Sequence, residues 1–151
     1  MSDSAITGAC LCGAVAFSVE PPTLGSAHCH CPYCRRAHGA PLVTWLVAEE
    51  ARFTVERGAD TVKWHQSSEQ SRRGFCRECG TTMFFASTLC PGEIHIAYGA
   101  LLSPADRLPK AHVFTEHRVA WFDFNDALAH YRGDGPELAK YRAVNPLRKA
   151  D

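Results

Sequence analysis

Cys76-Arg-Glu-Cys-Gly80 is a C-x-x-C-G knuckle, in which a tight turn brings two sulfurs together. The glycine after the pair can adopt a positive φ, which lets backbone amides approach the sulfurs. Upstream, Cys10-Leu-Cys-Gly13 supplies a second pair just before an expected strand, where residues two apart face the same side. The two pairs predict a closed tetrahedral zinc site made of Cys10, Cys12, Cys76 and Cys79. Because 63 residues separate the pairs, this ion would join the start of the chain to its centre.

A second cluster, Cys29-His-Cys-Pro-Tyr-Cys34, supplies three more sulfurs within six residues and no obvious fourth ligand. Three protein ligands and an open position are typical of catalytic zinc sites. Cys29, Cys31 and Cys34 therefore predict a second zinc site with an open position. A neighbouring histidine or the isolated Cys90 could instead close it and make it structural.

The histidines near this cluster differ in the direction they are expected to face. In an extended segment His28 and His30 point away from Cys29 and Cys31, so they are candidates for acid–base work rather than ligands. His38 follows an expected helical turn and could approach from either side. His30 and His38 are accordingly the predicted proton-transfer residues, because an imidazole titrates near neutral pH.

A redox function is the alternative for the same segment. Cys31-Pro-Tyr-Cys34 is similar to the dithiol of glutaredoxins, which begins a long helix in a βαβ unit. The chain shows no βαβ pattern, and Cys29 adds a thiol that a redox motif does not need. Because Arg35, Arg36 and His38 would lower a nearby thiol pKa, a thiol redox protein using Cys31 and Cys34 stays open as an interpretation.

Composition narrows the class of protein. The 151 residues predict a single domain, residues 1–151. Sixteen basic and sixteen acidic residues balance, and nucleic-acid binders normally carry a net basic surface, so no nucleic-acid partner is expected. The longest uncharged apolar stretch, residues 37–48, is 12 residues long and a membrane span needs about 20, so no membrane partner is expected. No signal peptide is visible, and reduced thiols favour a cytoplasmic protein.

The hydrophobic pattern predicts a mostly antiparallel β domain with long connections and short helical turns. Short alternating runs bounded by turn residues indicate strands. The expected strands are residues 14–19, 42–47, 52–56, 61–66, 81–86 and 93–98. The expected helical turns are residues 32–37, 103–107 and 137–142.

The order of the motifs resembles the glutathione-dependent formaldehyde-activating enzyme family, which includes the centromere protein V relatives. The resemblance rests on seven cysteines at matching spacing, covers about residues 5–122, and leaves residues 123–151 without a decisive motif. It implies a zinc-stapled β-tent fold with structural zinc on the Cys10 and Cys76 pairs and a second zinc on Cys29, Cys31 and Cys34. It also implies a carbon–sulfur lyase that joins glutathione and formaldehyde reversibly into S-(hydroxymethyl)glutathione. A non-catalytic zinc-binding interaction module is the second interpretation, and the oligomeric state is left unassigned.

Charge suggests a mechanism for the three-cysteine site. Three thiolates on Zn²⁺ carry a net charge of minus one, which suits a fourth thiolate better than it suits making hydroxide. We therefore expect the open position to take the sulfur of a small thiol substrate such as glutathione. Since a guanidinium matches a carboxylate well, Arg35, Arg36 and Arg73 are the predicted substrate-binding residues, together with neighbouring Arg72.

Overall fold

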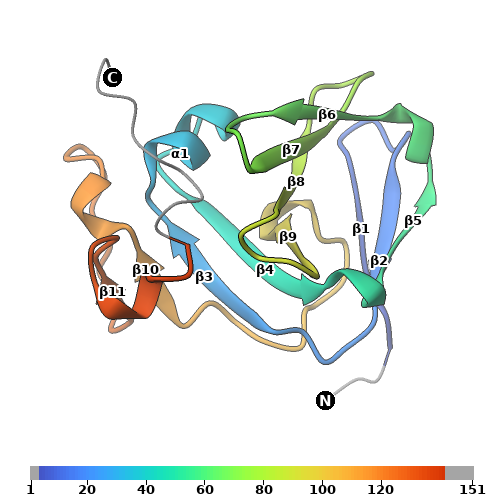
Figure 1. Cartoon of the computed structure of the whole chain (residues 1–151). Coiled ribbons are helices and arrows are strands. Elements are labelled where there is room, and N and C mark those ends of the chain that lie inside the picture. Colours follow the sequence, from blue (N-terminus) through green and yellow to red (C-terminus); the bar gives the residue numbers. More distant parts are fainter. Residues whose placement is uncertain (1–3, 142–151) are drawn as a thin grey trace.

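The computed structural model describes residues 4–141, which form two sheets and one α-helix (Figure 1). The smaller sheet has three antiparallel strands in the order β1-β2-β5: β1 (Ile6–Ala9), β2 (Ala16–Val19) and β5 (Phe53–Arg57). The larger sheet has eight strands in the order β11-β10-β3-β4-β9-β8-β7-β6. Its strands are β3 (Gly25–Cys29), β4 (Val43–Glu49), β6 (Val62–Gln66), β7 (Ser71–Cys76), β8 (Thr82–Ser87), β9 (Glu93–Ala97), β10 (Ala111–Val113) and β11 (Ala129–Tyr131).

Helical structure is confined to short connections. The α-helix α1 (Pro32–His38) joins β3 to β4, and these strands are antiparallel neighbours. Five 3₁₀ turns complete the described residues: Glu50–Arg52, Ala59–Thr61, Tyr98–Ala100, Thr115–His117 and Pro136–Leu138. Within residues 4–141 the structure contains no helix with the length and apolar character needed to cross a membrane.

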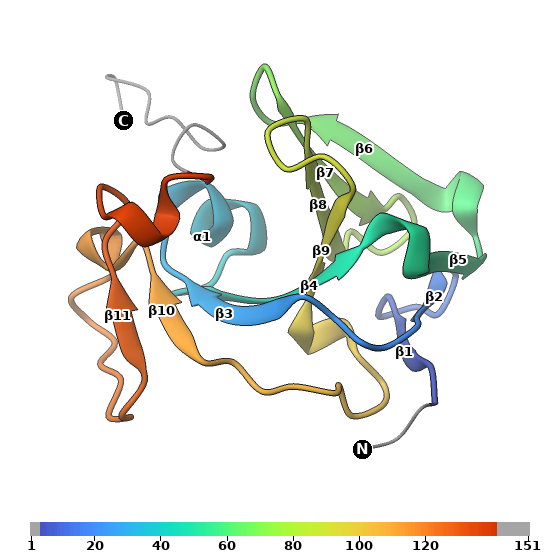
Figure 2. The same ribbon diagram turned by 60° about the horizontal axis from the view of Figure 1, so that its bottom comes forward.

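The prediction of a mostly antiparallel β fold is confirmed. The exceptions are β3, β10 and β11, which pair in parallel at one end of the larger sheet. In Figures 1 and 2 these strands lie at the opposite end of the molecule from β1, β2 and β5. The smaller sheet packs against β4, β9 and β8 in the middle of the larger one, where most of the core lies.

One face of the larger sheet packs against the smaller sheet. Leu46, Ile96 and Phe84 are paired neighbours on β4, β9 and β8, so their side chains share this face. All three are fully buried, and the Phe84 ring meets the Phe17 ring of β2 edge-on at 5.2 Å. This face forms the main hydrophobic core.

The opposite face of the larger sheet has a different character. Val47, His95, Phe85 and Arg73 are successive cross-strand partners on β4, β9, β8 and β7. Phe85 belongs to a second, smaller cluster of buried side chains, which also contains Trp45 and four buried cysteines. The second face therefore combines aromatic side chains with titratable ones, and it carries the candidate site.

Some predicted elements were wrong or incomplete. Residues 103–107 are not helical, because hydrogen bonds hold this segment in an irregular path: Thr23 donates to the Asp106 carboxylate from its backbone N (2.9 Å) and its Oγ1 (2.6 Å). The helical turn predicted for residues 137–142 is a 3₁₀ turn at Pro136–Leu138, and residue 142 lies outside the described residues. The pattern also missed five strands, namely β1, β3, β7, β10 and β11.

Gly8 gives a direct test of how tightly β1 packs against the Phe17 ring of β2 and the 3₁₀ turn Tyr98–Ala100. A Cβ at this position would lie 2.1 Å from Cζ of Phe17 and 2.8 Å from the carbonyl oxygen of Ala100. Gly8→Ala is therefore expected to lower the free energy of unfolding by about 1–3 kcal/mol, the usual cost of overpacking. Urea unfolding would measure it, with Gly99→Ala as the control because a Cβ at Gly99 meets nothing within 4 Å. Equal stability of the two variants would contradict the packing described here.

Candidate metal centres and the adjoining pocket

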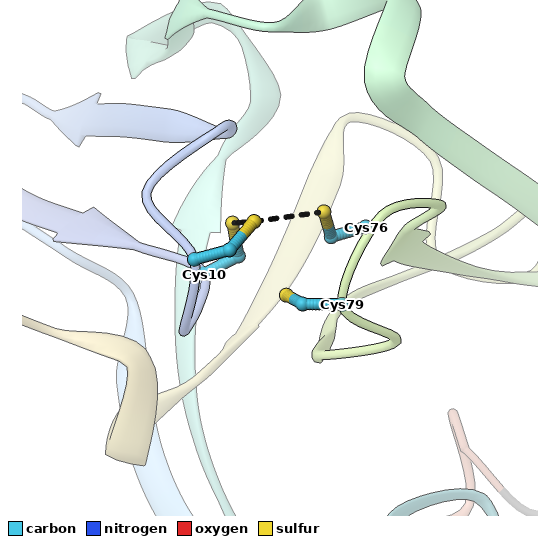
Figure 3. Close-up of side chains that lie close together, drawn as sticks. Cys10, Cys76 and Cys79 are labelled. Carbon is cyan, nitrogen blue, oxygen red and sulfur yellow. Dashed lines mark hydrogen bonds between the residues drawn. The ribbon is translucent and has the colours of Figure 1, made fainter.

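The two distant cysteine pairs meet in space. Cys10 lies in the loop after β1, whereas Cys76 ends β7 and Cys79 lies in the turn before β8. Figure 3 shows Cys10 facing Cys76 and Cys79 across the space between the two loops. The Sγ atoms of Cys10 and Cys12 are 3.6 Å apart, and those of Cys12 and Cys76 are 3.9 Å apart. A tetrahedron with Zn–S bonds near 2.3 Å has edges of about 3.8 Å, so these four sulfurs are spaced for zinc.

Backbone amides turn toward this site, as the knuckle motif predicts. Gly13 and Gly80 both have φ +77°, a conformation that only glycine adopts readily. After the turn at Gly13 the backbone N–H of Val15 donates to Cys10 Sγ at 3.2 Å, and after the turn at Gly80 the backbone of Thr81 hydrogen-bonds to Cys79. A hydrogen bond to sulfur stabilises the thiolate, which is the form that binds metal.

Two of the four sulfurs, Cys12 and Cys79, have pKa values shifted in opposite directions. A hydrogen bond from Thr81 lowers the pKa of Cys79 to about 5. A backbone hydrogen bond from Ala14 acts to lower the pKa of Cys12, but desolvation and the neighbouring sulfurs outweigh it and raise that pKa to about 12. The protein alone cannot hold four thiolates this close together. A divalent cation removes the conflict, so the donor set fits zinc by charge as well as by spacing.

The three-cysteine cluster forms where β3 passes into α1. Cys29 ends β3, Cys31 caps the helix and Cys34 lies in its first turn, where its backbone N–H donates to Cys31 Sγ at 3.3 Å. The three sulfurs lie within 4.8 Å of one another and all are buried. Among residues 4–141, no further histidine, cysteine, aspartate or glutamate joins this group, and Cys90 belongs to a different one. Within the described residues, this group therefore offers three ligand atoms, all of them cysteine sulfurs.

Arg73 supplies the positive charge beside this cluster. The residue is 4% exposed, its guanidinium carbon lies 4.9 Å from the centre of the Phe85 ring, and both Nη atoms lie 3.8 Å from Cys34 Sγ. Hydrogen bonds from Cys29 and Cys31, with the charge of Arg73, hold the pKa of Cys34 well below its usual value. The same neighbouring sulfurs and burial push the pKa of Cys29 well above its usual value. One thiolate is stable here without metal, whereas three require a dication, and these residues therefore fit zinc.

A pocket of about 270 Å³ opens directly beside two of these sulfurs. Its wall is formed by cysteine and by aromatic or aliphatic side chains on the second face of the sheet. Its residues include Cys29, Cys34, Trp45, Val47, Phe85 and Phe114. No lysine, arginine, aspartate or glutamate is among the described residues that line it. A ligand bound to the cluster from this side would meet a largely apolar surface.

His95 is the titratable side chain on the pocket wall that sequence reasoning missed. Its Nε2 lies 3.1 Å from the Glu93 carboxylate, which also accepts a hydrogen bond from the Tyr141 hydroxyl at 3.3 Å and pairs with Lys140. Glu93 and His95 share a face of β9, so the alternating pattern Glu93-Ile-His95 carried a signal. The hydrogen bond to His95, followed by the one to Lys140, lowers the pKa of Glu93 to about 2, so this carboxylate stays charged.

The two predicted proton-transfer histidines do not line this pocket. His30 is buried on the other side of β3, with its Nε2 2.8 Å from Nδ1 of His112, whose Nε2 faces the Asp126 carboxylate at 3.0 Å. Burial, with the neighbouring His112, lowers the pKa of His30 to about 4. His38 ends α1 and meets the Trp45 ring edge-on at 5.3 Å, and Trp45 lines the pocket. The acid–base roles of His30 and His38 stay predictions.

The predicted arginines separate into three environments. Arg73 touches the cluster, as described above. Arg35 is half-buried and donates from Nε to the His30 carbonyl at 3.1 Å. Arg36 is exposed and lines a separate depression with Tyr33 and Arg73 on the outer side of α1. None of the three lines the apolar pocket.

The C-terminal segment contributes two residues to the pocket wall. Its sequence gives no sign of this contribution. Leu138 and Tyr141 line the pocket together with Phe114, and Leu138 is buried. Residues 123–141 carry no motif, yet β11 and the following 3₁₀ turn bring them over the second face of the sheet. The tail therefore covers the pocket rather than lying apart from it.

Known proteins share this sequence and architecture. A family model described as glutathione-dependent formaldehyde-activating enzyme matches residues 5–117. A Halomonas elongata protein named "Putative glutathione-dependent formaldehyde-activating enzyme" is 26% identical over 125 residues, covering 78% of this chain and 80% of that protein. An uncharacterized lyase of Schizosaccharomyces pombe is 32% identical over 83 residues, covering 54% of this chain and 57% of that protein. A crystal structure of a Rhodobacter sphaeroides protein has a TM-score of 0.56 and 28% identity, over 66% of this chain and 91% of that one.

Proposed function

This chain belongs to the glutathione-dependent formaldehyde-activating enzyme family, and we propose that it is a zinc-dependent carbon–sulfur lyase acting on thiol–aldehyde adducts. The family and its lyase-named relative support a lyase function related to glutathione and formaldehyde. S-(hydroxymethyl)glutathione, formed from glutathione and formaldehyde, is the reference substrate of the proposal. The free state of all eight cysteines agrees with a reducing compartment and supports a cytoplasmic location.

The observation that carries the proposal is the three-sulfur cluster with its pocket. Cys29, Cys31 and Cys34 offer three ligand atoms, and the pocket reaches two of these residues from the side. A catalytic zinc site needs this combination of incomplete protein coordination and access for a ligand. The four-cysteine site has its full complement of protein ligands, so we assign it the structural role.

Zinc held by Cys29, Cys31 and Cys34 would keep a substrate thiol deprotonated at neutral pH. The chain's own part is to balance charge and to orient the substrate. Arg73, fixed by the Phe85 ring and Cys34, offsets the negative charge that three thiolates leave on the site. The apolar wall excludes water from the carbon that bears the sulfur, which strengthens electrostatic interactions there. Arg35 and Arg36 lie outside the pocket, and we propose that they meet the carboxylates of glutathione beside α1, where Arg36 lines the separate depression with Tyr33 and Arg73.

Exchange of formaldehyde with glutathione, followed by proton NMR on the zinc-loaded protein, tests the proposal. We expect the protein to accelerate the interconversion of the free thiol and the S-hydroxymethyl adduct. Because thiols add to formaldehyde unaided, the rate without protein must be subtracted at each concentration. An exchange rate equal to that background, in protein holding two zinc ions per chain, would overturn the lyase proposal and favour a non-catalytic zinc module.

A further inference from the structure

The pocket beside the three-cysteine cluster is much larger than the aldehyde in the reference reaction. Its volume is about 270 Å³. A water molecule occupies about 30 Å³ of liquid, so this pocket has room for roughly nine molecules of that size, whereas formaldehyde has only two heavy atoms. A small aldehyde would leave most of the apolar wall in contact with water.

The residues that line the pocket indicate the kind of chemical group that it can bind. Trp45, Phe85, Phe114 and Tyr141 provide aromatic surface, and Val47 lies on the same face of the sheet. No charged side chain among the described lining residues could meet the carboxylates or the amine of a peptide thiol. Burying a charged group without a partner is costly, so the charged part of the substrate must lie outside.

One polar group breaks this apolar surface. His95 lies on the wall, and its Nε2 is engaged by Glu93. His95 is one of the residues that line the pocket, and within residues 4–141 no hydrogen bond engages its other ring nitrogen, Nδ1. A carboxylate that fixes one nitrogen of an imidazole orients the ring and supports proton exchange at the other.

We propose that this pocket takes the hydrocarbon part of a larger apolar aldehyde, joined to the thiol as a hemithioacetal, and that His95 exchanges its hydroxyl proton. The inference rests on the lyase function proposed above and names its substrate class. In the cleavage direction the C–S bond breaks and its electron pair leaves on sulfur as thiolate. At the same time the hydroxyl proton passes to Nδ1 of His95 and the carbon–oxygen double bond forms. No oxidant or reductant takes part, and the reverse reaction returns the proton to the oxygen.

Gly25→Leu tests the substrate class without touching the cluster. Gly25 lines the pocket and a Cβ there meets nothing within 4 Å, so the larger side chain fills the pocket rather than disturbing the fold. The probes are the glutathione adducts of phenylacetaldehyde and formaldehyde, which differ only in the aldehyde. We expect the native protein to cleave the phenylacetaldehyde adduct with the higher kcat/KM. Gly25→Leu should lower that value about 10-fold or more, the usual effect of a blocked apolar pocket, and lower the value for the formaldehyde adduct by a clearly smaller factor.

Gly99→Leu is the matched control, because a Cβ at Gly99 also meets nothing within 4 Å and Gly99 does not line this pocket. It should leave the ratio of the two kcat/KM values unchanged. If the native protein prefers formaldehyde, or if Gly25→Leu lowers both values equally, the substrate class is wrong while the lyase function stands. If the zinc-loaded protein accelerates neither adduct, both proposals fail.

The proton-exchange role is tested by His95→Gln beside His30→Gln and His38→Gln. Loss of a general acid–base group typically costs about 10²–10⁴-fold in rate, so His95→Gln should lower kcat by that factor for both adducts. It should leave KM and zinc content nearly unchanged, a split between kcat and KM that a purely structural role would not produce. A retained kcat in His95→Gln, with loss of kcat in His38→Gln or His30→Gln, would overturn the assignment.

Discussion

Cys76→Ser is expected to remove one zinc ion per chain and most of the folded stability. Cys76 is 0% exposed, and its sulfur lies 3.9 Å from that of Cys12 on the far side of the site. The ion it helps to hold would join the loop after β1 to the turn between β7 and β8. Structural zinc contributes about 10–16 kcal/mol in small domains, which is as large as the whole stability of a typical protein. Loss of one ligand should therefore leave a chain that is largely unfolded at 37 °C.

Zinc analysis and thermal unfolding followed by circular dichroism would measure this effect. Cys90→Ser is the matched control, because Cys90 is also buried but lies outside both clusters of three and four cysteines. The control should keep its full zinc content. If the melting temperature of Cys76→Ser lies within a few degrees of that of Cys90→Ser, the four-cysteine site does not stabilise the fold.

The cysteine sites could be predicted because their ligands are close in sequence. In C-x-C-G and C-x-x-C-G the spacing alone brings two sulfurs together, and the glycines at 13 and 80 permit the turns. A metal then demands that the two pairs meet, so a contact across 63 intervening residues follows from chemistry rather than from hydrophobic pattern. The structure brings all four cysteines within 4.8 Å, as this reasoning requires.

The pocket could not be predicted in the same way. Its wall depends on which strands are neighbours: Val47, His95 and Phe85 become a row only because β9 lies between β4 and β8. No local spacing encodes that order. The expected acid–base residues were therefore sought beside the cysteines in sequence, at His30 and His38, whereas His95 reaches the pocket from a distant strand.

The last two strands of the described chain, β10 and β11, were missed for a related reason. Each has three residues, which is too short for an alternating pattern to be recognised. Parallel pairing of β10 with β3 and of β11 with β10 holds them, together with the contact between the His112 and His130 rings, whose centroids lie 4.7 Å apart. Tertiary contacts thus define this end of the sheet, and they carry the C-terminal residues to the pocket.

Cys29→Ser is expected to abolish lyase activity and leave the fold intact, the opposite outcome to Cys76→Ser. Cys29 ends β3, where the backbone is paired with β4 on one side and β10 on the other. These backbone hydrogen bonds keep the strand in place when the sulfur is removed. Cys34 is a poorer choice, because its loss would leave the buried Arg73 guanidinium without its sulfur partner. Removal of an outer-sphere partner of a metal ligand already costs about 10–100-fold, so removal of a direct ligand should exceed 10²-fold.

The measurement is turnover of the glutathione–formaldehyde adduct together with zinc content and the melting temperature. Zinc should fall from two ions per chain to one, since the four-cysteine site is unchanged, and the melting temperature should stay within a few degrees of Cys90→Ser. Full activity with one zinc ion would place the chemistry away from the three-cysteine cluster. Unfolding of Cys29→Ser would instead give this cluster a structural role. If Cys29→Ser stays folded but loses turnover and one zinc ion, the three-cysteine cluster carries the chemistry. The four-cysteine site then carries the stability.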